Sequence, residues 1–254
     1  MRRSYTEDAM ASKVRINRFL AAAGLGSRRK CEDLIRAGLV CVNGQKVDRL
    51  ARLVDPDNDV ITVDGEKIAW NQKKIILVLN KPEGVLSTVS DSFNRKTVID
   101  LAREHGYTER LFPVGRLDLD TSGIIIITND GELAYRLMHP RFKIEKRYIV
   151  TVEGRVSQST IDDLVTGVVA DDFVTQPCTI RVLKRGSDTT ELDIRLKEGM
   201  KRQIKRMFGL YGHTVVKLKR VALGGMEFGD VEIGDIRPLT PAEERHLRRL
   251  AKLA

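Results

Sequence analysis

The chain has 254 residues, 42% of them hydrophobic and 31% charged, which is the composition of a globular protein with one large or two modest domains. Its longest apolar runs, 75–79 and 124–127, are too short to cross a bilayer, and its three cysteines form no CxxC pair, which argues against a membrane-spanning protein and a disulfide framework. The formal charge of +9 is concentrated: residues 13–46 carry +6, residues 195–220 carry +8 and the remainder carries −5, so a polyanionic partner such as nucleic acid is favoured. Each basic cluster, taken alone, also fits a solvated helix face.

The first twelve residues show no hydrophobic periodicity, so residues 1–12 are predicted to be a flexible tail. They include basic residues, but no apolar stretch follows them, which does not fit a secretory signal. We therefore expect a reduced, cytoplasmic protein.

Two helices and a hairpin are predicted next. Apolar residues at positions 16, 19, 20 and 23 have helical spacing, and this helix is expected to end at Gly24 or Gly26. Ser27 is placed as the N-cap of a second helix that ends at Gly38. Asn43-Gly44, between two short β-prone runs, predicts a two-residue hairpin turn.

Residues 15–47, RINRFLAAAGLGSRRKCEDLIRAGLVCVNGQKV, resemble the S4 RNA-binding domain, and the resemblance extends to about Lys67. It implies a small S4-like domain at 13–70 that holds RNA phosphates at the N-terminus of the second helix. The residues expected to contact RNA here are Arg15, Arg18, Ser27, Arg28, Arg29 and Lys30. A helix-turn-helix on duplex DNA is the alternative, but the second helix lacks the Asn and Gln that read base edges well. Cys31 and Cys41 are interpreted as core residues, because no histidine precedes His105 to complete a zinc site.

After a polar linker at 71–74, strong strands separated by helices are predicted. The strands are expected at 75–80, 123–128, 146–153, 178–184, 189–197 and 214–221, and the helices near 97–104, 131–138, 157–166 and 201–211. Because several strands are adjacent in the chain, an α+β domain with a mixed sheet at 75–238 is favoured over regular α/β alternation. Residues 222–236 are expected to be irregular, and Pro241 begins a charged helix in the terminal segment 239–254.

Metal and nucleotide chemistry are disfavoured. The four histidines form no HxxxH or HExxH pattern, and no GxxxxGK or GxGxxG loop is present to hold phosphates. His139 and His213 fall at predicted helix ends and are interpreted as capping or surface groups. No metal site is predicted.

The segment 114–127, VGRLDLDTSGIIII, places Arg116, Asp118 and Asp120 in alternation before an apolar strand. If residues 115–120 are extended, the three side chains share one face at the mouth of a buried strand, where the pKa of a carboxylate can be perturbed. The alternative is a solvent-facing strand end with a salt bridge and a Thr-Ser-Gly turn.

Residues 198–213, EGMKRQIKRMFGLYGH, predict an amphipathic helix with an apolar face that joins the core. The other face carries Lys201, Arg202, Lys205 and Arg206. A solvated face and a phosphate-binding face explain this pattern equally well.

Four motifs, in order, resemble the RsuA-type family of pseudouridine synthases: NKPEGVLST at 80–88, GRLDLDTSG at 115–123, EKRY at 145–148 and GMKRQIKRMF at 199–208. The resemblance covers the chain to about Pro238. It implies an α+β catalytic domain with a mixed, mainly antiparallel β-sheet flanked by helices, and isomerisation of one uridine in ribosomal RNA with neither cofactor nor metal. The implied substrate is 23S rRNA in preference to 16S rRNA, as free RNA or in an assembling ribosomal subunit; we expect a monomer with no membrane partner.

The same resemblance implies residue roles. Asp118 matches the catalytic aspartate of the family, Tyr148 its stacking tyrosine, and Lys205 the basic residue that pairs with the aspartate, where many relatives have arginine. Arg116 matches an arginine that, in related synthases, occupies the space left by the flipped nucleotide. Further RNA contacts are expected at Lys81, Lys201, Arg202 and Arg206.

The chemistry explains these residue types. Pseudouridine formation breaks the N1–C1′ bond, rotates the uracil and rejoins it through C5, so it needs a carboxylate, a closed pocket and a ring that stacks on the extruded base. Asp118 could add covalently to the substrate or remove a ribose proton, and the sequence leaves both routes open. Two other functions stay open: an RNA-binding or ribosome assembly protein, favoured if Asp118 is exposed and far from Lys205, and a metabolite enzyme, favoured by a neutral pocket.

Overall fold

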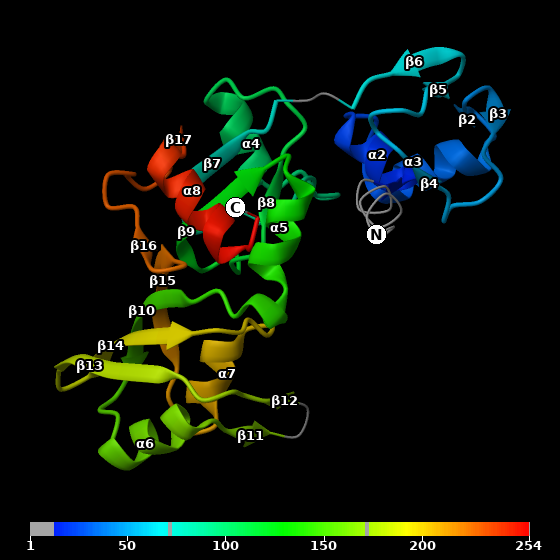
Figure 1. The fold of residues 1–254 in the computed structure, drawn as a ribbon. Helices are drawn as coiled ribbons and strands as arrows, with labels where there is room; N and C mark the ends of the chain where they lie inside the picture. Colours follow the sequence, from blue (N-terminus) through cyan, green and yellow to red (C-terminus); the bar gives the residue numbers. More distant parts are fainter. Residues whose placement is uncertain (1–12, 71–72, 171–172, 254) are drawn as a thin grey trace. The chain divides into compact units, whose positions relative to one another are not determined.

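The structure is a computed structural model that describes residues 13–70, 73–170 and 173–253. The chain divides into two units, Met1–Lys74 and Ile75–Ala254 (Figure 1). The tail predicted at 1–12 and part of the linker predicted at 71–74 lie outside the described residues.

The first unit is a helical pair with a small sheet. Its helices are α2 (Ile16–Ala22) and α3 (Arg28–Arg36). Its strands are β1 (Val14–Arg15), β2 (Val40–Val42), β3 (Gln45–Lys46), β4 (Leu53–Val54), β5 (Ile61–Val63) and β6 (Glu66–Ile68). The sheet order is β3-β2-β5-β6, and β1 pairs with β4. The predicted helices and the hairpin are confirmed, and β4 to β6 are elements that the sequence did not predict.

Local signals explain the start of α3 and the core of this unit. The side chain of Ser27 accepts a hydrogen bond from the backbone N–H of Lys30 (3.1 Å), as an N-cap residue does. Cys31 is fully buried in the hydrophobic cluster, and the ring of Phe19 stacks on Trp70 with centroids 5.1 Å apart. The cysteine is therefore a core residue, as the sequence predicted.

The second unit is built on a sheet that has nine strands in the part of the chain described. The strand order is β13-β14-β10-β15-β9-β7-β17, with β16 beside β15 and β8 beside β9. The strands are β7 (Ile76–Lys81), β8 (Phe112–Val114), β9 (Ser122–Thr128), β10 (Lys146–Glu153), β13 (Thr179–Arg185), β14 (Thr189–Leu196), β15 (Val215–Leu223), β16 (Met226–Glu227) and β17 (Ile236–Pro238). Of the described pairings, β15 with β9 is parallel and the others in this sheet are antiparallel, so the predicted mixed, mainly antiparallel sheet is confirmed.

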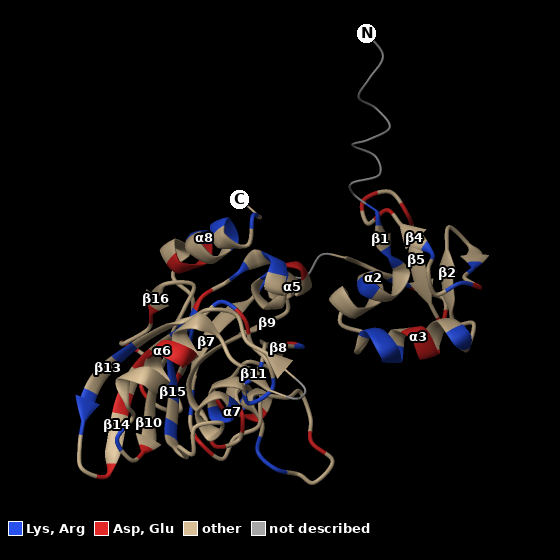
Figure 2. Ribbon diagram, turned by 90° about the horizontal axis from the view of Figure 1, so that it is seen from below, with Lys and Arg blue, Asp and Glu red and all other residues tan. Residues whose placement is uncertain are grey.

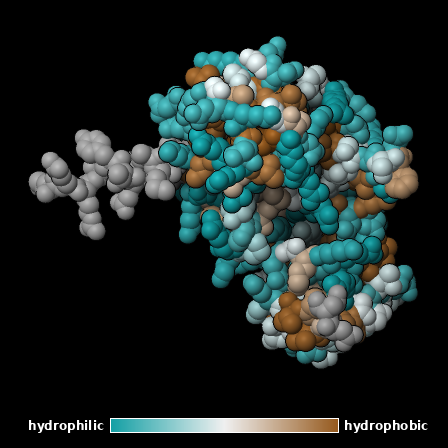
Figure 3. Space-filling view, turned by 90° about the vertical axis from the view of Figure 1, so that its right-hand side faces the viewer, coloured by the Kyte–Doolittle hydropathy of each residue, from teal (hydrophilic) through white to brown (hydrophobic). Residues whose placement is uncertain are grey.

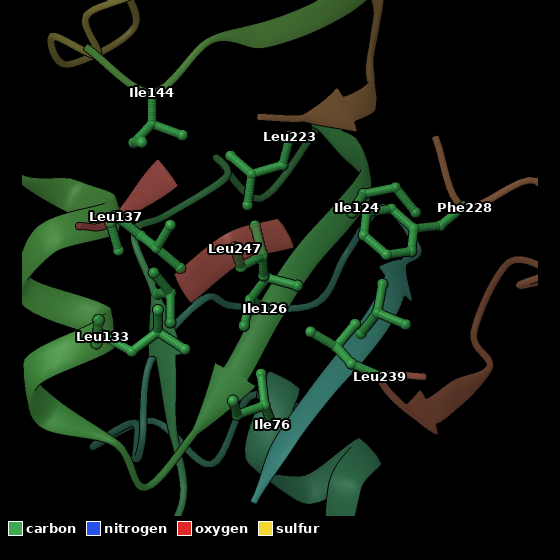
Figure 4. Packing of buried hydrophobic residues seen from close by; sticks show 14 of the residues in the cluster. Ile76, Ile124, Ile126, Leu133, Leu137, Ile144, Leu223, Phe228, Leu239 and Leu247 are labelled. Atoms are coloured by element: carbon green, nitrogen blue, oxygen red, sulfur yellow. The ribbon is translucent and has the colours of Figure 1, made fainter. Parts of the chain in front are cut away.

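Helices pack on the sheet of the second unit. They are α4 (Val98–Glu104), α5 (Gly131–Met138), α6 (Gln158–Thr166), α7 (Gln203–Gly209) and α8 (Pro241–Leu250), with the short helix η1 (Pro140–Phe142) and the strand pair β11 (Val169–Ala170) and β12 (Phe173–Val174). In β9, Ile124 and Ile126 pack with α5 and α8 (Figure 4), whereas Ile125 and Ile127 pack with α4. Because both faces are buried, the strand is apolar throughout, and each buried isoleucine stabilises the fold by roughly 1.5–3 kcal/mol.

The outer part of the sheet has a separate core. Strands β10 and β14 pack with α6 and α7 in a cluster that includes Leu164 and Phe208, both fully buried. Ser157 caps α6 by accepting a hydrogen bond from Thr160 N. The sheet therefore joins two cores, one around β7 and β9 and one around β10 and β14.

Two features of the second unit differ from the sequence prediction. Helix α7 is shorter than 201–211, because Arg202 adopts a left-handed conformation (φ 53°) that no helix continues through. The segment 222–236 is not wholly irregular, since it contains β16 and leads into β17, which pairs with β7. The terminal helix α8 begins at Pro241, as predicted, and it packs on the sheet with Leu247 fully buried.

No helix of the described residues is long and apolar enough to cross a membrane. On the face seen in Figure 3, hydrophilic side chains predominate and hydrophobic ones form scattered groups.

Candidate active site

The aspartate singled out by the sequence lies in a loop. Residues 115–120 were expected to be extended, but Gly115 has a positive φ (78°) and turns the chain away from β8 before β9 begins at Ser122. Arg116, Asp118 and Asp120 therefore do not share one face of an extended segment, and that prediction is wrong.

Hydrogen bonds from the preceding motif hold this loop. The hydroxyl of Ser87 donates to the carbonyl of Leu117 (3.0 Å) and accepts from its N–H (3.1 Å), and Gly84 N donates to Leu119 O (2.8 Å). Thr121 N donates to Asp118 O (3.1 Å), which closes the turn that leads into β9. Asp118 is thus flanked by anchored residues on both sides.

Asp118 and Tyr148 line one cavity of about 340 Å³, although thirty residues separate them in the chain. Of the residues expected from the sequence, the same cavity is lined by Arg116, Lys201 and Arg202. All three of these cations are exposed, whereas Asp118 and Tyr148 are half-buried. A carboxylate and an aromatic ring below a basic rim suit a polyanionic substrate that inserts one ring.

Lys205 pairs with Asp120 and not with Asp118, which corrects the pairing implied by the resemblance. Its Nζ lies 2.5 Å from Asp120 Oδ2, and no ion pair joins it to Asp118 among the residues the structure describes. This hydrogen bond holds the pKa of Asp120 below its usual value, with the charge of Lys205 acting in the same direction. The Asp120 side chain is 59% exposed, so the pair joins the Asp118 loop to α7 at the surface, outside the cavity lining.

Two of the expected RNA contacts are engaged elsewhere. Lys81 was expected to contact RNA, but it is fully buried, and its ammonium donates to the carbonyls of Pro82 and Val85, each at 2.8 Å. Burial lowers the pKa of Lys81 to about 8. Its expected role is therefore wrong, because a side chain enclosed in this way does not reach a phosphate. The guanidinium of Arg206 lies 3.8 Å from the ring centroid of Phe173 and is half-buried.

Polar residues that the sequence did not assign to a site also line the cavity, among them Thr121, Lys146 and Arg220. Arg220 is 4% exposed, and its Nε donates to Ile124 O at 2.6 Å. Burial lowers the pKa of Lys146 to about 8, with Arg220 lowering it further and Glu198 opposing. Lys146 belongs to the quoted EKRY motif, but nothing in the sequence alone shows that β15 places Arg220 beside Tyr148.

The residues of the first unit that were expected to contact RNA lie at the start of α2 and at the start of α3. Arg15, Ser27, Arg28, Arg29 and Lys30 are exposed, and Arg18 is half-buried. Figure 2 shows positive charge at both ends of α3 and negative charge between them. Arg28 donates to Asn17 Oδ1 (3.4 Å), so one cation of the set also braces α2 against α3.

No group of three or more His, Cys, Asp or Glu side chains that could hold a metal ion occurs in the described ranges.

These features define the class of the protein: a basic helical module precedes an α+β domain in which a carboxylate and a tyrosine share one cavity. Residues 75–209 match the family model described as RNA pseudouridylate synthase, and residues 14–61 match the S4 domain. The chain belongs to the RNA pseudouridylate synthase family, in its S4-containing RsuA-type branch, as its motifs indicated. It is a pseudouridine synthase, an isomerase, and its S4 domain implies that it binds RNA.

Two curated relatives are similar over nearly the whole chain. An RNA pseudouridine synthase of Aquifex aeolicus (strain VF5), described as uncharacterized, is 43% identical over 232 residues, 91% of this chain and 92% of that protein. The ribosomal large subunit pseudouridine synthase B of Bacillus subtilis (strain 168) is 38% identical over 239 residues, 93% of this chain and 96% of that protein. A crystal structure described as that of pseudouridylate synthase has a TM-score of 0.65 and 27% identity, covering 92% of this chain and 99% of that one.

Proposed function

We propose that the chain isomerises one uridine of ribosomal RNA and that its target lies in 23S rRNA of the large subunit. The observation that carries this proposal is the similarity to ribosomal large subunit pseudouridine synthase B, at 38% identity over 93% of the chain. Two other outcomes are a target in 16S rRNA and a target that is modified only in an assembling subunit. Chemical mapping of pseudouridine distinguishes all three.

Asp118 is the catalytic carboxylate in this proposal. It lines the cavity, whereas Asp120 is exposed and bound to Lys205. An ionised carboxylate beside the bound nucleotide either adds to the substrate or removes a ribose proton, and both routes use the same residue. No second reactant is needed, because the atoms of uridine and pseudouridine are the same.

Tyr148 stacks on the extruded uracil, and Arg116 enters the space that the nucleotide leaves. Base extrusion costs a few kcal/mol, which stacking of about 1–3 kcal/mol offsets. Lys201, Arg202 and the basic residues around α3 neutralise phosphates, while Lys205 holds the Asp118 loop through Asp120. Lys205 thus acts as a positioning residue.

The site of modification is tested by chemical mapping of pseudouridine in total RNA from cells with and without the protein. The proposal expects one uridine of 23S rRNA to lose its signal in the cells without the protein and to regain it when purified protein is added to their RNA. A signal that changes only in 16S rRNA or transfer RNA contradicts the proposed substrate. A signal restored only in isolated ribosomal particles identifies the assembling subunit as the substrate.

The assignment of the carboxylate is tested by the matched pair Asp118→Asn and Asp120→Asn. Asp118→Asn keeps the shape and removes the charge, so it should abolish product formation in a single-turnover assay while RNA binding persists. Asp120→Asn should retain substantial turnover and lose only the modest stability of a partly exposed ion pair. Product from Asp118→Asn, after deamidation to aspartate has been excluded by mass spectrometry, contradicts the assignment.

A further inference from the structure

The floor of the cavity contains two cations whose donors are not all used by the described residues. The Nε of Arg220 donates a hydrogen bond to Ile124 O, but its Nη2 is buried and has no hydrogen-bond partner among the described residues. Lys146 is half-buried, and no hydrogen bond or ion pair joins it to another residue that the structure describes. Both side chains line the cavity.

Sheet register places these cations beside Tyr148. Arg220 on β15 is directly opposite Tyr148 on β10, and Lys146 lies two residues before Tyr148 on the same strand. Cross-strand partners point to one face of a sheet, as do residues two apart in a strand. A ring stacked on Tyr148 therefore meets both cations.

The nearest acidic group does not satisfy them. Glu198 also lines the cavity and attracts Lys146, but its Oε1 accepts hydrogen bonds from Gln176 N (2.9 Å) and Gln203 Nε2 (2.6 Å). A third polar group, the hydroxyl of Thr121, is also buried without a partner in the part of the chain described. Buried polar groups are normally hydrogen-bonded, so a set of free donors around one cavity indicates a ligand that supplies acceptors.

The neighbours of the two cations favour a base over a phosphate. Leu196 and Leu218 line the cavity with them, and an apolar wall suits a planar ring, whereas Arg116, Lys201 and Arg202 at the exposed rim remain available for phosphates. Uracil offers carbonyl acceptors at O2 and O4. Cytosine has an amino donor at position 4, which would leave a cation without an acceptor.

The reaction itself places negative charge on this ring. When the N1–C1′ bond breaks, its electron pair remains on uracil and spreads over N1, O2 and O4. After rotation, C5 supplies the electron pair of the new bond to C1′, the proton on C5 is lost and N1 gains a proton, so the overall composition is unchanged. Fixed cations at the carbonyl oxygens stabilise the charged stage more than the neutral substrate.

We propose that Lys146 and Arg220 form a cationic floor that binds the carbonyl oxygens of the flipped uracil and stabilises the charge that the ring carries while detached. This proposal rests on the proposed function, because it takes uridine in RNA as the substrate. It gives the two residues catalytic roles and makes the floor a determinant of uracil over cytosine.

The test compares Lys146→Met and Lys146→Arg with Lys217→Met, which removes the same charge from an exposed position of β15. Substrate is total RNA from cells lacking the protein, so the target is present whichever RNA contains it. Lys146→Met should lower the single-turnover rate about 100-fold, as the loss of one preorganised donor does, without weakening RNA binding. Lys146→Arg should recover most of the rate and Lys217→Met should match the parent. Arg220→Lys, with its thermal unfolding measured because Arg220 is buried, should lose rate to an intermediate extent.

A second measurement separates the floor from a merely structural role. A fragment spanning the mapped site is prepared with sulfur in place of O4 or O2 of the target uridine, since sulfur is the weaker acceptor. In the parent enzyme at least one substitution should slow the reaction, and in Lys146→Met the same substitution should have little further effect.

Additive effects of sulfur and Lys146→Met, or a parent-like rate in Lys146→Met, overturn the floor. Weaker RNA binding with an unchanged rate at saturation assigns Lys146 to a phosphate instead and also overturns it. The position of the mapped product tests the proposed 23S substrate independently, because the rate ratio between variants does not depend on which RNA is modified.

Discussion

We expect the hydroxyl of Ser87 to fix the position of Asp118. The variant Ser87→Ala, which lacks this hydroxyl, tests the expectation. Ser87 is 8% exposed, and its hydroxyl both donates to and accepts from the backbone of Leu117, the residue before Asp118. Alanine leaves the buried N–H and carbonyl of Leu117 without these partners.

The expected cost follows from that geometry. Two hydrogen bonds contribute about 1 kcal/mol each, and buried groups left unsatisfied add a desolvation penalty of about 1–3 kcal/mol, so Ser87→Ala should lower the free energy of unfolding by about 2–4 kcal/mol. Catalysis should suffer more than folding, since a displacement of about 1 Å at a reacting group can cost about 100-fold in rate. We expect a fall of roughly 10- to 100-fold in the single-turnover rate at a temperature where the variant is fully folded.

Thr88→Ala is the matched control, because the hydroxyl of Thr88 makes one exposed hydrogen bond to Ser90 O (3.0 Å) in the same loop. Urea denaturation gives the free energies of unfolding, and pseudouridine formation on the mapped fragment gives the rates. If Ser87→Ala and Thr88→Ala agree in stability within about 0.5 kcal/mol, the usual range for surface changes, and both react at the parent rate, the hydroxyl of Ser87 does not hold the loop.

Four further predictions concern a glycine of β9, base stacking, the S4 domain and pH. Gly123→Ala should destabilise the fold by about 2 kcal/mol or more, because a Cβ at Gly123 (φ 108°) would lie 2.1 Å from the backbone oxygen of Arg220. Gly84→Ala is the control: no atom lies within 4 Å of a Cβ there, so it should show only the cost of its positive φ. Equal losses of unfolding free energy in urea denaturation contradict this prediction. Tyr148→Phe should retain RNA affinity, because the phenylalanine ring still stacks on the base. If turnover falls while affinity is unchanged, the Tyr148 hydroxyl takes part in proton transfer. Full activity in Tyr148→Ala shows that the residue does not belong to the site. Deleting residues 1–67 should leave the second unit folded, since in the part of the chain described its hydrophobic clusters contain only residues from 75 onward. The slope of log affinity for RNA against log salt should become shallower by about 0.7–0.9 for each phosphate that the protein no longer neutralises. An unchanged slope excludes the S4 domain from RNA binding. Activity should decline as pH rises through about 8, where Lys146, facing Arg220 on β15 and Glu198 after β14, loses its proton, and Lys146→Met should lack that decline. Because the pKa of Lys146 is lower in the folded than in the unfolded chain, the loss of this proton does not itself destabilise the fold.

Periodicity and capping residues predicted the elements that depend on local interactions. The helices that begin after Ser27 and near residues 97, 131 and 157 start within one residue of their predicted positions, because side-chain caps and an apolar stripe determine them. The strand 123–128 was equally clear, since its continuous apolar run matches burial on both faces. Strand β17 was missed because it has three residues and pairs with β7, which is distant in the chain. Strands β5 and β6 were missed although they form a local hairpin, joined by the two-residue turn Asp64-Gly65.

Sequence motifs predicted part of the candidate site, whereas residues that only tertiary contacts bring to the cavity were missed. Asp118 and Tyr148 were found from motifs and do line one cavity. Lys81 looked like a surface cation in a polar motif, but the carbonyls of Pro82 and Val85 turn toward it and enclose its ammonium. Arg220 gave no signal, because VVKLKRVAL reads as an ordinary half-exposed strand until its register against Tyr148 is known.

The two aspartates of the DLD sequence differ because the loop turns only one of them into the cavity. Asp120 is bound to the ammonium of Lys205, so its oxygen is occupied and its charge is neutralised at the surface. Asp118 lines the cavity and forms no ion pair in the part of the chain described, so its oxygens remain free to react while Lys146 and Arg220 lie on the same cavity lining. Burying charged groups without partners lowers the stability of the folded protein. The arrangement is explained if a substrate that gains negative charge during the reaction fills the space between Asp118 and the two cations.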